Sequence, residues 1–337
     1  MTMPKRLRVG VIGLGVGEKH IAAYQSHPDC EVVALCDFDE ARLTTARDKY
    51  PGLRRTKVAD ELLTDPEISL ISIASYDNYH YPQIMQALNN NKHVFVEKPL
   101  CLYEQEAREI RRRLEDNPSL RLSSNLVLRT VPRFRWLRQM IADGRMGQLY
   151  YVEGDYNYGR LHKITEGWRG KIDFYSVVYG GGVHLVDLLL WLTGDRVVEV
   201  AAYGNNLSSR GSGFNYNDMV VAILRFHSGM VGKVAANFGN VSPHFHALQI
   251  YGTQATFVNG ADCGLLYTSR EPDKPPQKIA EPYPGQQQDR VIHSFVDSIL
   301  HNTVPEVDAE AIFQTMSVCF AIEKATHQSG SVMVKYV

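Results

Sequence analysis

The chain has little of what would mark a membrane protein, a secreted protein or a nucleic-acid-binding protein. No hydrophobic run reaches the length of a membrane-spanning helix, and the best candidate, residues 185–192, contains Asp187. Residues 1–8 hold no apolar segment of a secretory signal. The 36 basic and 37 acidic side chains leave a formal net charge of −1, so neither nucleic acid nor an anionic membrane is expected as a partner.

Cysteine is scarce as well. The five cysteines, Cys30, Cys36, Cys101, Cys263 and Cys319, are scattered and odd in number, and none forms a Cys-x-x-Cys pair. This usage is typical of reduced thiols, so we predict a cytoplasmic protein with neither a disulfide framework nor a metal site.

The first part of the chain alternates between apolar strands and amphipathic helices. Strands are predicted at residues 7–12, 31–36, 68–74 and 93–96, and helices at 18–26, 39–50, 82–90 and 103–115. Such alternation is typical of a doubly wound parallel sheet. We therefore predict an α/β Rossmann domain over residues 1–122.

Beyond residue 122 strands dominate. They are predicted at residues 148–158, 196–203, 219–226, 230–238, 246–251 and 256–259, with helices at 132–142, 289–301 and 308–328 and a loop at 271–288. The hairpin-like spacing favours antiparallel pairing. Residues 123–337 are therefore expected to form an α+β domain with a large, mostly antiparallel open sheet, which makes two domains in a chain of 337 residues.

A glycine-rich turn, Gly13-Leu14-Gly15-Val16-Gly17, lies between the first strand and the first helix. Glycines let the backbone approach a pyrophosphate, and the helix N-terminus favours its charge. Glu18 stands where a third spaced glycine is usual. Asp37 ends the second strand. A carboxylate at this place accepts hydrogen bonds from ribose hydroxyls and repels the 2′-phosphate of NADP, so NAD is favoured over NADP as the cofactor. The alternative is an ordinary aspartate before a helix, with Asp39 as the cap.

Lys98 follows the strand at residues 93–96 and precedes Pro99. In an open α/β sheet this position opens into the same crevice as the glycine turn. Oxidation of an alcohol needs a base beside the hydroxyl proton, and a neutral lysine amine can serve; the positive nicotinamide of NAD would favour that neutral form. The alternative is a solvated lysine that merely follows a strand.

Several motifs occur together along nearly the whole chain. They are residues 13–20, Asp37, residues 75–80, Glu97-Lys98-Pro99, Trp168-Arg169, residues 180–194 and residues 328–332. Together they resemble the glucose–fructose oxidoreductase/inositol dehydrogenase (Gfo/Idh/MocA) family. The resemblance implies NAD(P)-linked oxidation or reduction of sugars, polyols and nucleotide sugars. It also implies a homodimer or homotetramer formed through the C-terminal sheet.

The resemblance also implies roles for individual residues. Lys98 and His184 are the expected catalytic residues. The expected cofactor-binding residues are Gly13, Gly15, Val16, Gly17, Asp37, Ser75, Tyr76, His80, Glu97 and Lys98. The expected substrate-binding residues are Lys98, Tyr156, Arg160, Trp168, Arg169, His184 and Asp187. Family dehydrogenases often carry an aspartate four residues before the histidine, whereas this chain has Gly180 there.

Two groups of residues keep an alternative interpretation. His184 and Asp187 are three apart in a predicted helix and share a face, so they either meet a substrate or form a core histidine satisfied by an aspartate. Tyr156, Tyr158, Arg160, His162, Lys163, Trp168 and Arg169 form an aromatic and basic group that suits a sugar ring and a phosphate. An ordinary packed strand end with surface charges fits them as well. His20 is expected only to pack its helix.

Taken together, the sequence predicts a NAD-dependent oxidoreductase acting on a sugar or nucleotide sugar. One alternative within the same fold is elimination or epimerisation with NAD recycled in each turnover. Another is a regulator that binds NAD and a sugar without turnover, because a fold alone does not fix a function.

Overall fold

The computed structural model describes residues 6–285 and 287–337. By their contacts, Met1–Leu126, Gln287–Phe313 and Val337 form one compact unit (unit 1), and Val127–Gln286 and Gln314–Tyr336 form a second (unit 2). The predicted boundary at residue 122 is close to that division, but assigning all of 123–337 to the second domain is a mismatch. Residues 1–5, part of the segment 1–8 considered above, and Gln286 of the predicted loop lie outside the described residues.

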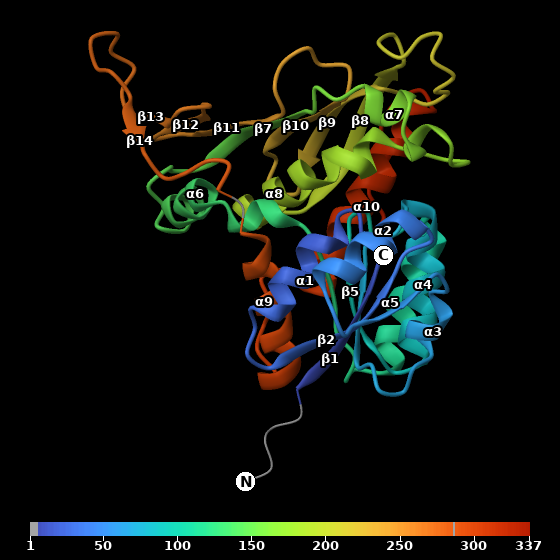
Figure 1. Cartoon of the computed structure of the whole chain (residues 1–337). Coiled ribbons are helices and arrows are strands. Elements are labelled where there is room, and N and C mark those ends of the chain that lie inside the picture. Colours follow the sequence, from blue (N-terminus) through green and yellow to red (C-terminus); the bar gives the residue numbers. More distant parts are fainter. Residues whose placement is uncertain (1–5, 286) are drawn as a thin grey trace. The chain divides into compact units, whose positions relative to one another are not determined.

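Unit 1 contains a six-stranded sheet in which every pair is parallel, in the order β3-β2-β1-β4-β5-β6 (Figure 1). The strands are β1 (Leu7–Ile12), β2 (Cys30–Cys36), β3 (Arg54–Thr56), β4 (Leu70–Ile73), β5 (His93–Val96) and β6 (Leu122–Ser124). All four residues of β4 are buried, as expected for a parallel strand covered on both faces. The predicted Rossmann arrangement is confirmed.

The helices of unit 1 agree with the sequence patterns except that a short helix at Asp60–Leu63 was not predicted and that one helix begins earlier than expected. They are α1 (Gly17–Gln25), α2 (Glu40–Lys49), α3 (Asp60–Leu63), α4 (Asp77–Asn89), α5 (Glu104–Asp116), α9 (Gln288–His301) and the beginning of α10 (Ala309–Thr326). Asp39 caps α2 as one interpretation predicted, because its Oδ1 accepts the Ala41 N–H at 2.9 Å. Helix α4 begins at Asp77 rather than at Pro82, with an acidic side chain in its first turn, where the helix dipole favours it.

Helix α9 explains why residues 287–313 belong to unit 1. It packs against α1, and the Phe295 ring lies 5.8 Å from the ring of Phe95 on β5. Val291, Ile292 and Val296 are also buried. An amphipathic pattern predicts that a helix buries one face, but it does not say which sheet that face covers.

Unit 2 contains a nine-stranded sheet in the order β14-β13-β12-β11-β7-β10-β9-β8-β15 (Figure 1). Its strands are β7 (Leu149–Asn157), β8 (Val197–Asn205), β9 (Met219–Phe226), β10 (Val231–Asn237), β11 (Phe245–Gly252), β12 (Thr256–Asn259), β13 (Gly264–Tyr267), β14 (Gln277–Ile279) and β15 (Val332–Met333). Only the β7–β10 pair is parallel among the described pairs, so the predicted mostly antiparallel sheet is confirmed.

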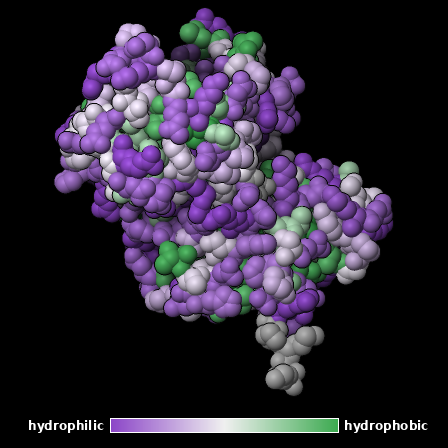
Figure 2. Space-filling model, turned by 90° about the vertical axis from the view of Figure 1, so that its left-hand side faces the viewer, coloured by the Kyte–Doolittle hydropathy of each residue, from purple (hydrophilic) through white to green (hydrophobic). Residues whose placement is uncertain are grey.

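The helices of unit 2 are α6 (Pro132–Ala142), α7 (His162–Thr165), α8 (Val183–Thr193) and the last part of α10, with a π-helical stretch at Val178–Gly182 before α8. Helix α8 packs on β7, where Gly154 leaves room for the side chain of Leu185. Among the described residues no helix is long and apolar enough to cross a membrane. Figure 2 shows a face that is mostly hydrophilic, with small separate hydrophobic groups, as is normal for a folded chain.

A buried ion pair lies inside unit 2. The Arg129 guanidinium donates from Nε to Oδ2 of Asp187 at 2.9 Å and from Nη2 to Oδ1 at 2.5 Å. Asp187 lies on α8 and is fully buried, and Arg129 lies in the 3₁₀ turn at Val127–Thr130. The Thr315 hydroxyl also donates to Asp187, at 3.3 Å. The carboxylate is thus committed to holding α8 in the unit.

We expect Asp187→Ala to lower the free energy of unfolding of the protein by about 3–5 kcal/mol, because the Arg129 guanidinium stays buried without its counter-charge. Urea unfolding followed by circular dichroism measures this. The double variant Arg129→Met/Asp187→Leu should recover most of the loss. Glu271→Ala is the control, since it breaks the exposed Lys274–Glu271 pair and should change little. Equal effects of Asp187→Ala and Glu271→Ala would contradict the assigned role.

Candidate functional site

The functional residues predicted in unit 1 lie at the carboxyl ends of neighbouring strands. Asp37 follows β2, Gly13 follows β1, Ser75 comes soon after β4, and Glu97 and Lys98 follow β5. In the sheet these strands stand in the order β2-β1-β4-β5, so Asp37 and Lys98 are three strand spacings apart, or about 15 Å. The edge of the sheet thereby lines up a carboxylate, a glycine turn and an amine in the crevice where open α/β sheets bind ligands.

The glycine turn needs its glycines for identifiable reasons. Gly13 has φ +88°, and a Cβ there would collide with the Ala74 carbonyl. A Cβ at Gly17 would lie 3.1 Å from the Ala74 Cβ, so this glycine lets α1 start close to β4. Val16 is about half exposed at the start of α1. The turn therefore brings uncovered backbone to the start of a helix, which is the arrangement that accepts a pyrophosphate.

Asp37 is almost fully buried and directed at that turn. Its Oδ2 accepts the Leu14 N–H at 2.7 Å, and its Oδ1 accepts the Asp39 N–H at 2.9 Å. The Arg42 guanidinium lies 3.5 Å from Oδ2. Asp37 also lines a pocket beside the turn, together with Ile12, Gly13, Cys36, Phe38, Arg42, Lys57, Ala59, Ala74, Ser75, Tyr76, Tyr79 and Gln83. Its aromatic walls and buried carboxylate suit an adenosine with free ribose hydroxyls.

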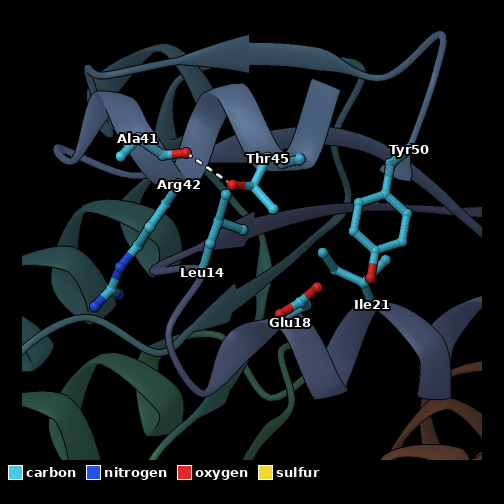
Figure 3. Close-up of a pocket in the computed structure, with 8 residues that line it drawn as sticks. Leu14, Glu18, Ile21, Ala41, Arg42, Thr45 and Tyr50 are labelled. Carbon is cyan, nitrogen blue, oxygen red and sulfur yellow. Dashed lines mark hydrogen bonds between the residues drawn. The ribbon is translucent and has the colours of Figure 1, made fainter. Parts of the chain in front are cut away.

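A smaller hollow lies between α1 and α2 (Figure 3). Glu18, which replaces the usual third glycine, forms an ion pair there with Lys49 at 2.6 Å. Its side chain therefore joins two helices at the surface rather than covering the turn. Arg42 also lines this hollow, and Figure 3 shows its side chain extending away from Tyr50.

His80 is fully buried and bonds two backbone carbonyls. Its Nδ1 lies 2.6 Å from the Pro99 oxygen and its Nε2 lies 3.2 Å from the Ser75 oxygen. Both ring nitrogens thus join the loops after β4 and β5, and the predicted cofactor contact of His80 stays a prediction. Ser75 and Tyr76 do line the pocket beside Asp37, as expected of cofactor-binding residues.

Glu97 is the centre of a buried polar network. Its Oε1 accepts from Asn125 Nδ2 at 2.7 Å and lies 3.2 Å from His20 Nε2, while its Oε2 accepts the Lys98 N–H at 3.3 Å. The other ring nitrogen of His20 lies 3.0 Å from the Ser72 hydroxyl. Burial acts to raise the pKa of Glu97, but the bonds and charges around it, those of His20 first, lower it to about 2.

This network concerns two residues singled out in the sequence. The cofactor contact expected of Glu97 stays a prediction; in the structure its carboxylate bonds His20, Asn125 and the Lys98 main chain. His20 was expected only to pack its helix, yet it is a fully buried partner of that carboxylate. The signal for His20 was its place on the apolar side of α1, one turn after Gly17, because a histidine there needs a polar partner.

Lys98 is therefore held from both sides through its main chain. Its N–H donates to Glu97, and the carbonyl of the next residue, Pro99, bonds His80. The residue itself is half-buried. Such anchoring fixes the position of the main chain from which the Lys98 side chain extends.

In unit 2 the predicted residues Tyr156 and His184 belong to one aromatic cluster, with Tyr158, His244 and His246 (the Tyr156 cluster). From the Tyr156 ring centroid the others lie 5.5 Å (Tyr158), 6.1 Å (His184), 4.9 Å (His244) and 5.4 Å (His246) away. The cluster gathers residues of β7, α8 and the start of β11. His244 and His246 were not predicted; His246 sits on the buried side of an alternating strand, the one signal available for it.

His246 is tied to Tyr283, whose hydroxyl lies 2.7 Å from Nδ1 and accepts the His246 N–H at 2.9 Å. Burial, with a smaller effect of His244, lowers the pKa of His246 to about 3. His246 is therefore neutral near pH 7 and offers hydrogen bonding without charge.

Two arginines lie over aromatic faces near this cluster. The Arg160 guanidinium is 5.1 Å from the Tyr158 ring centroid, and that of Arg169 is 4.6 Å from Trp168. The Asp187 carboxylate bonds Arg129 and Thr315, which gives it a structural role, and its predicted substrate contact stays a prediction. His162 and Lys163 are exposed on the short helix α7.

We expect Glu97→Gln to remove a pH-dependent contribution to stability. The native pKa of about 2 lies below the ordinary 4.5, so ionised Glu97 stabilises the fold by about 3 kcal/mol above pH 4.5, and this is lost as pH falls toward 2. The stability difference between wild type and variant should be largest at neutral pH and narrow below pH 4.5 in urea unfolding. Glu115→Gln, on the exposed side of α5, should show no such narrowing. A difference that does not change with pH would contradict the charged network.

Comparison with known proteins agrees with this geometry. Residues 7–124 match the oxidoreductase family with an NAD-binding Rossmann fold, and residues 134–258 match the GFO/IDH/MocA C-terminal domain. The chain is 23% identical to a myo-inositol 2-dehydrogenase of Thermotoga maritima, over 98% of this chain and 99% of that protein. It is 26% identical to an inositol 2-dehydrogenase of Corynebacterium glutamicum, over 70% and 68%.

Solved structures share the fold. A levoglucosan dehydrogenase in complex with NADH and L-sorbose has a TM-score of 0.87 at 19% identity, covering 98% of this chain and 99% of that one. An oxidoreductase domain protein from Kribbella flavida has a TM-score of 0.85 at 21% identity, covering 98% and 100%. The glycine turn, the parallel sheet and the matches to both domains establish that the chain is an NAD-binding oxidoreductase of the GFO/IDH/MocA family.

Proposed function

We propose that this protein is a NAD-dependent dehydrogenase or reductase that transfers hydride between nicotinamide and a hydroxyl or carbonyl carbon of a sugar or nucleotide sugar. The observation that carries the proposal is the anchored Lys98, three strands from Asp37 at the ligand-binding edge of the sheet. Relatives named inositol 2-dehydrogenase and a structural neighbour named levoglucosan dehydrogenase support a polyhydroxylated ring as substrate.

The chain's own residues take the following parts in the proposed reaction. Asp37 accepts hydrogen bonds from the ribose hydroxyls of NAD, and the turn at residues 13–17 binds its pyrophosphate. When bound, NAD supplies the hydride acceptor or donor. In the oxidative direction Lys98, as a neutral amine, accepts the hydroxyl proton while the carbinol carbon becomes a carbonyl; in reduction it returns that proton.

In unit 2 we propose that the Tyr156 cluster contacts the sugar. Aromatic faces pack against the C–H faces of a ring, and His184, a residue about a tenth exposed, offers a nitrogen to a hydroxyl. The nucleotide of a nucleotide sugar would meet Arg160 and Arg169, whose guanidinium groups suit phosphate oxygens.

Asp37→Ala should weaken NADH binding about ten- to hundredfold, because hydrogen bonds to a charged group contribute about 1.5–3 kcal/mol. Titration of the NADH fluorescence with protein measures this without any substrate. Asp39→Ala is the matched control two residues away: it removes the cap of α2 and lowers stability, but it should leave the NADH dissociation constant unchanged. Equal weakening by both variants would mean that Asp37 has no special role.

Lys98→Met should lower kcat about 10²- to 10⁴-fold, because proton transfer loses its base, while NADH binding stays near the wild-type value. A panel of polyols, sugars and nucleotide sugars with NAD, read by NADH absorbance, first finds the substrate. Lys49→Met, an exposed lysine on α2, is the control and should keep full activity. Full activity in Lys98→Met would overturn its assignment.

The same panel separates the proposed function from its alternatives. Net oxidation accumulates NADH in step with the carbonyl product. A redox-neutral elimination or epimerisation consumes substrate with no net NADH, and a regulator binds NADH and sugar without consuming either. Either of the last two outcomes would contradict the proposed function.

A further inference from the structure

Arg133 is a fully buried arginine on α6 that forms no ion pair with any described residue. Its guanidinium donates to the main-chain oxygen of Glu281 at 3.0 Å, to Oδ1 of Asn259 at 2.9 Å and to the main-chain oxygen of Gly260 at 2.6 Å. It also lies over the Tyr283 ring, 5.5 Å from the centroid. Burying a cation among neutral acceptors is costly, and burial accordingly lowers the pKa of Arg133. What the buried charge provides is a fixed position for Asn259 and Tyr283.

Both side chains that Arg133 fixes are bonded to His246. Asn259 donates from Nδ2 to the His246 carbonyl at 2.8 Å. The Tyr283 hydroxyl accepts the His246 N–H at 2.9 Å and lies 2.7 Å from Nδ1. Because an arginine can only donate, its bond to Oδ1 also determines which way the Asn259 amide faces. His246 is therefore held at its N–H, at its carbonyl and at one ring nitrogen.

These bonds determine which ring nitrogen of His246 carries the proton. Burial lowers the pKa of His246 to about 3, so the ring is neutral near pH 7 and has a single N–H. The Tyr283 oxygen already accepts the main-chain N–H, and its own proton is directed best to Nδ1. The other arrangement, with the ring proton on Nδ1, requires a second acceptor for the phenol proton. The bonds thus favour an unprotonated Nδ1 and an Nε2 that donates.

The Nε2 atom of His246 has no hydrogen-bond partner among residues 6–285 and 287–337. His246 is only 3% exposed. By ring centroids it lies 5.4 Å from Tyr156, 6.4 Å from His184 and 4.7 Å from His244. A buried N–H without an acceptor costs free energy, and an oxygen of a bound ligand removes that cost. The donor lies within the group of rings that is proposed to contact the sugar.

We infer that His246 binds the substrate of unit 2 by donating a hydrogen bond from Nε2 to one hydroxyl oxygen, and that Tyr283 and Arg133 are positioning residues that fix this donor. This role rests on the proposed function and adds a specificity-determining contact to it. A fixed neutral donor selects for a single oxygen: a sugar with a hydroxyl at that place pairs the N–H, whereas the corresponding deoxy sugar leaves it unpaired.

The first test locates the proton of His246 in the full-length protein without any substrate. Nitrogen NMR of isotope-labelled histidine distinguishes a protonated from an unprotonated ring nitrogen, and His246→Gln identifies the signals. We expect a proton on Nε2 and none on Nδ1, unchanged between about pH 8 and about pH 5 because the pKa lies near 3. Tyr283→Phe should give a mixture of both tautomers. A proton on Nδ1 in the wild type would overturn the inference.

The second test is calorimetric titration in the presence of NADH, so that the sugar binds without being oxidised. The ligands are the sugar identified by the panel above and its single-deoxy forms. His246→Phe should weaken binding of the intact sugar about tenfold. One deoxy form should bind wild type and His246→Phe alike, because it lacks the oxygen that His246 contacts. His246→Gln, whose amide places a donor near the position of Nε2, should recover part of the loss.

Variants of the positioning residues distinguish their role from a general effect on stability. Tyr283→Phe and Arg133→Lys should weaken binding of the intact sugar about three- to tenfold and raise KM more than they lower kcat, with the same deoxy form unaffected. Tyr251→Phe is the matched control. It removes a hydroxyl that bonds Gln249 on the opposite face of β11, and it should change neither the tautomer nor the affinity. If Arg133→Lys fails to fold, Tyr283→Phe alone decides, since it keeps the ring under the guanidinium.

The outcomes separate this role of His246 from the proposed function. If His246→Phe weakens the intact sugar and all deoxy forms equally, or weakens none of them, the donor role is wrong while the oxidoreductase assignment stands. If NADH binds but no sugar does, the proposed substrate class fails, and the donor role fails with it.

Discussion

The buried carboxylate of Glu97 is the constraint on which the cofactor-binding unit depends. A lone carboxylate in a protein interior is costly, so its position is tolerated only because His20, Asn125 and the Lys98 N–H surround it. Those partners come from α1, the end of β6 and the end of β5, while Ser72 on β4 holds the far side of His20. One charge therefore fixes four elements, among them the helix that begins at the glycine turn and the strand that delivers Lys98.

Unit 2 uses a buried carboxylate differently. Asp187 lies one helical turn beyond His184. Their spacing along the helix, taken alone, predicts that both side chains face a substrate. The structure instead assigns Asp187 to Arg129, so that the helix is secured from one side and His184 is left to the Tyr156 cluster. The acidic side chains of α8 and of the middle of β7 are thus paired with Arg129 and Lys233, and the Tyr156 cluster itself consists of phenols and imidazoles.

Much of unit 1 was predictable because its signals are local. The strands at Leu7–Ile12 and His93–Val96 were predicted to the residue, since each is a short apolar run with a clear end. The expected glycine turn and Asp37 follow from the same strand-end rule. What failed depended on distant partners: the start of α4, the place of residues 287–313 in unit 1, and the role of His20, whose partner Glu97 lies 77 residues along the chain. The hydrophobic periodicity of a sequence predicts which face of a helix or strand is buried, but not which other element packs on that face.

The proposed substrate site was the least predictable part, and the reason is physical. The carboxyl ends of parallel strands lie at one edge of the sheet, so residues that follow these strands come together whatever their distance in the sequence. A glycine motif and the end of a predicted strand are therefore enough to identify the proposed cofactor-binding residues. The Tyr156 cluster combines residues of β7 and α8 with two histidines, one on β11 and one in the loop before it. These segments are far apart in the sequence, and only the order of the strands in the sheet brings them together. At Gly180 a phenol from one segment takes the space of a side chain on another, because a Cβ there would collide with the Tyr175 hydroxyl. The proposed cofactor-binding positions therefore depend on the parallel sheet, whereas the proposed substrate site depends on contacts between separate segments of unit 2.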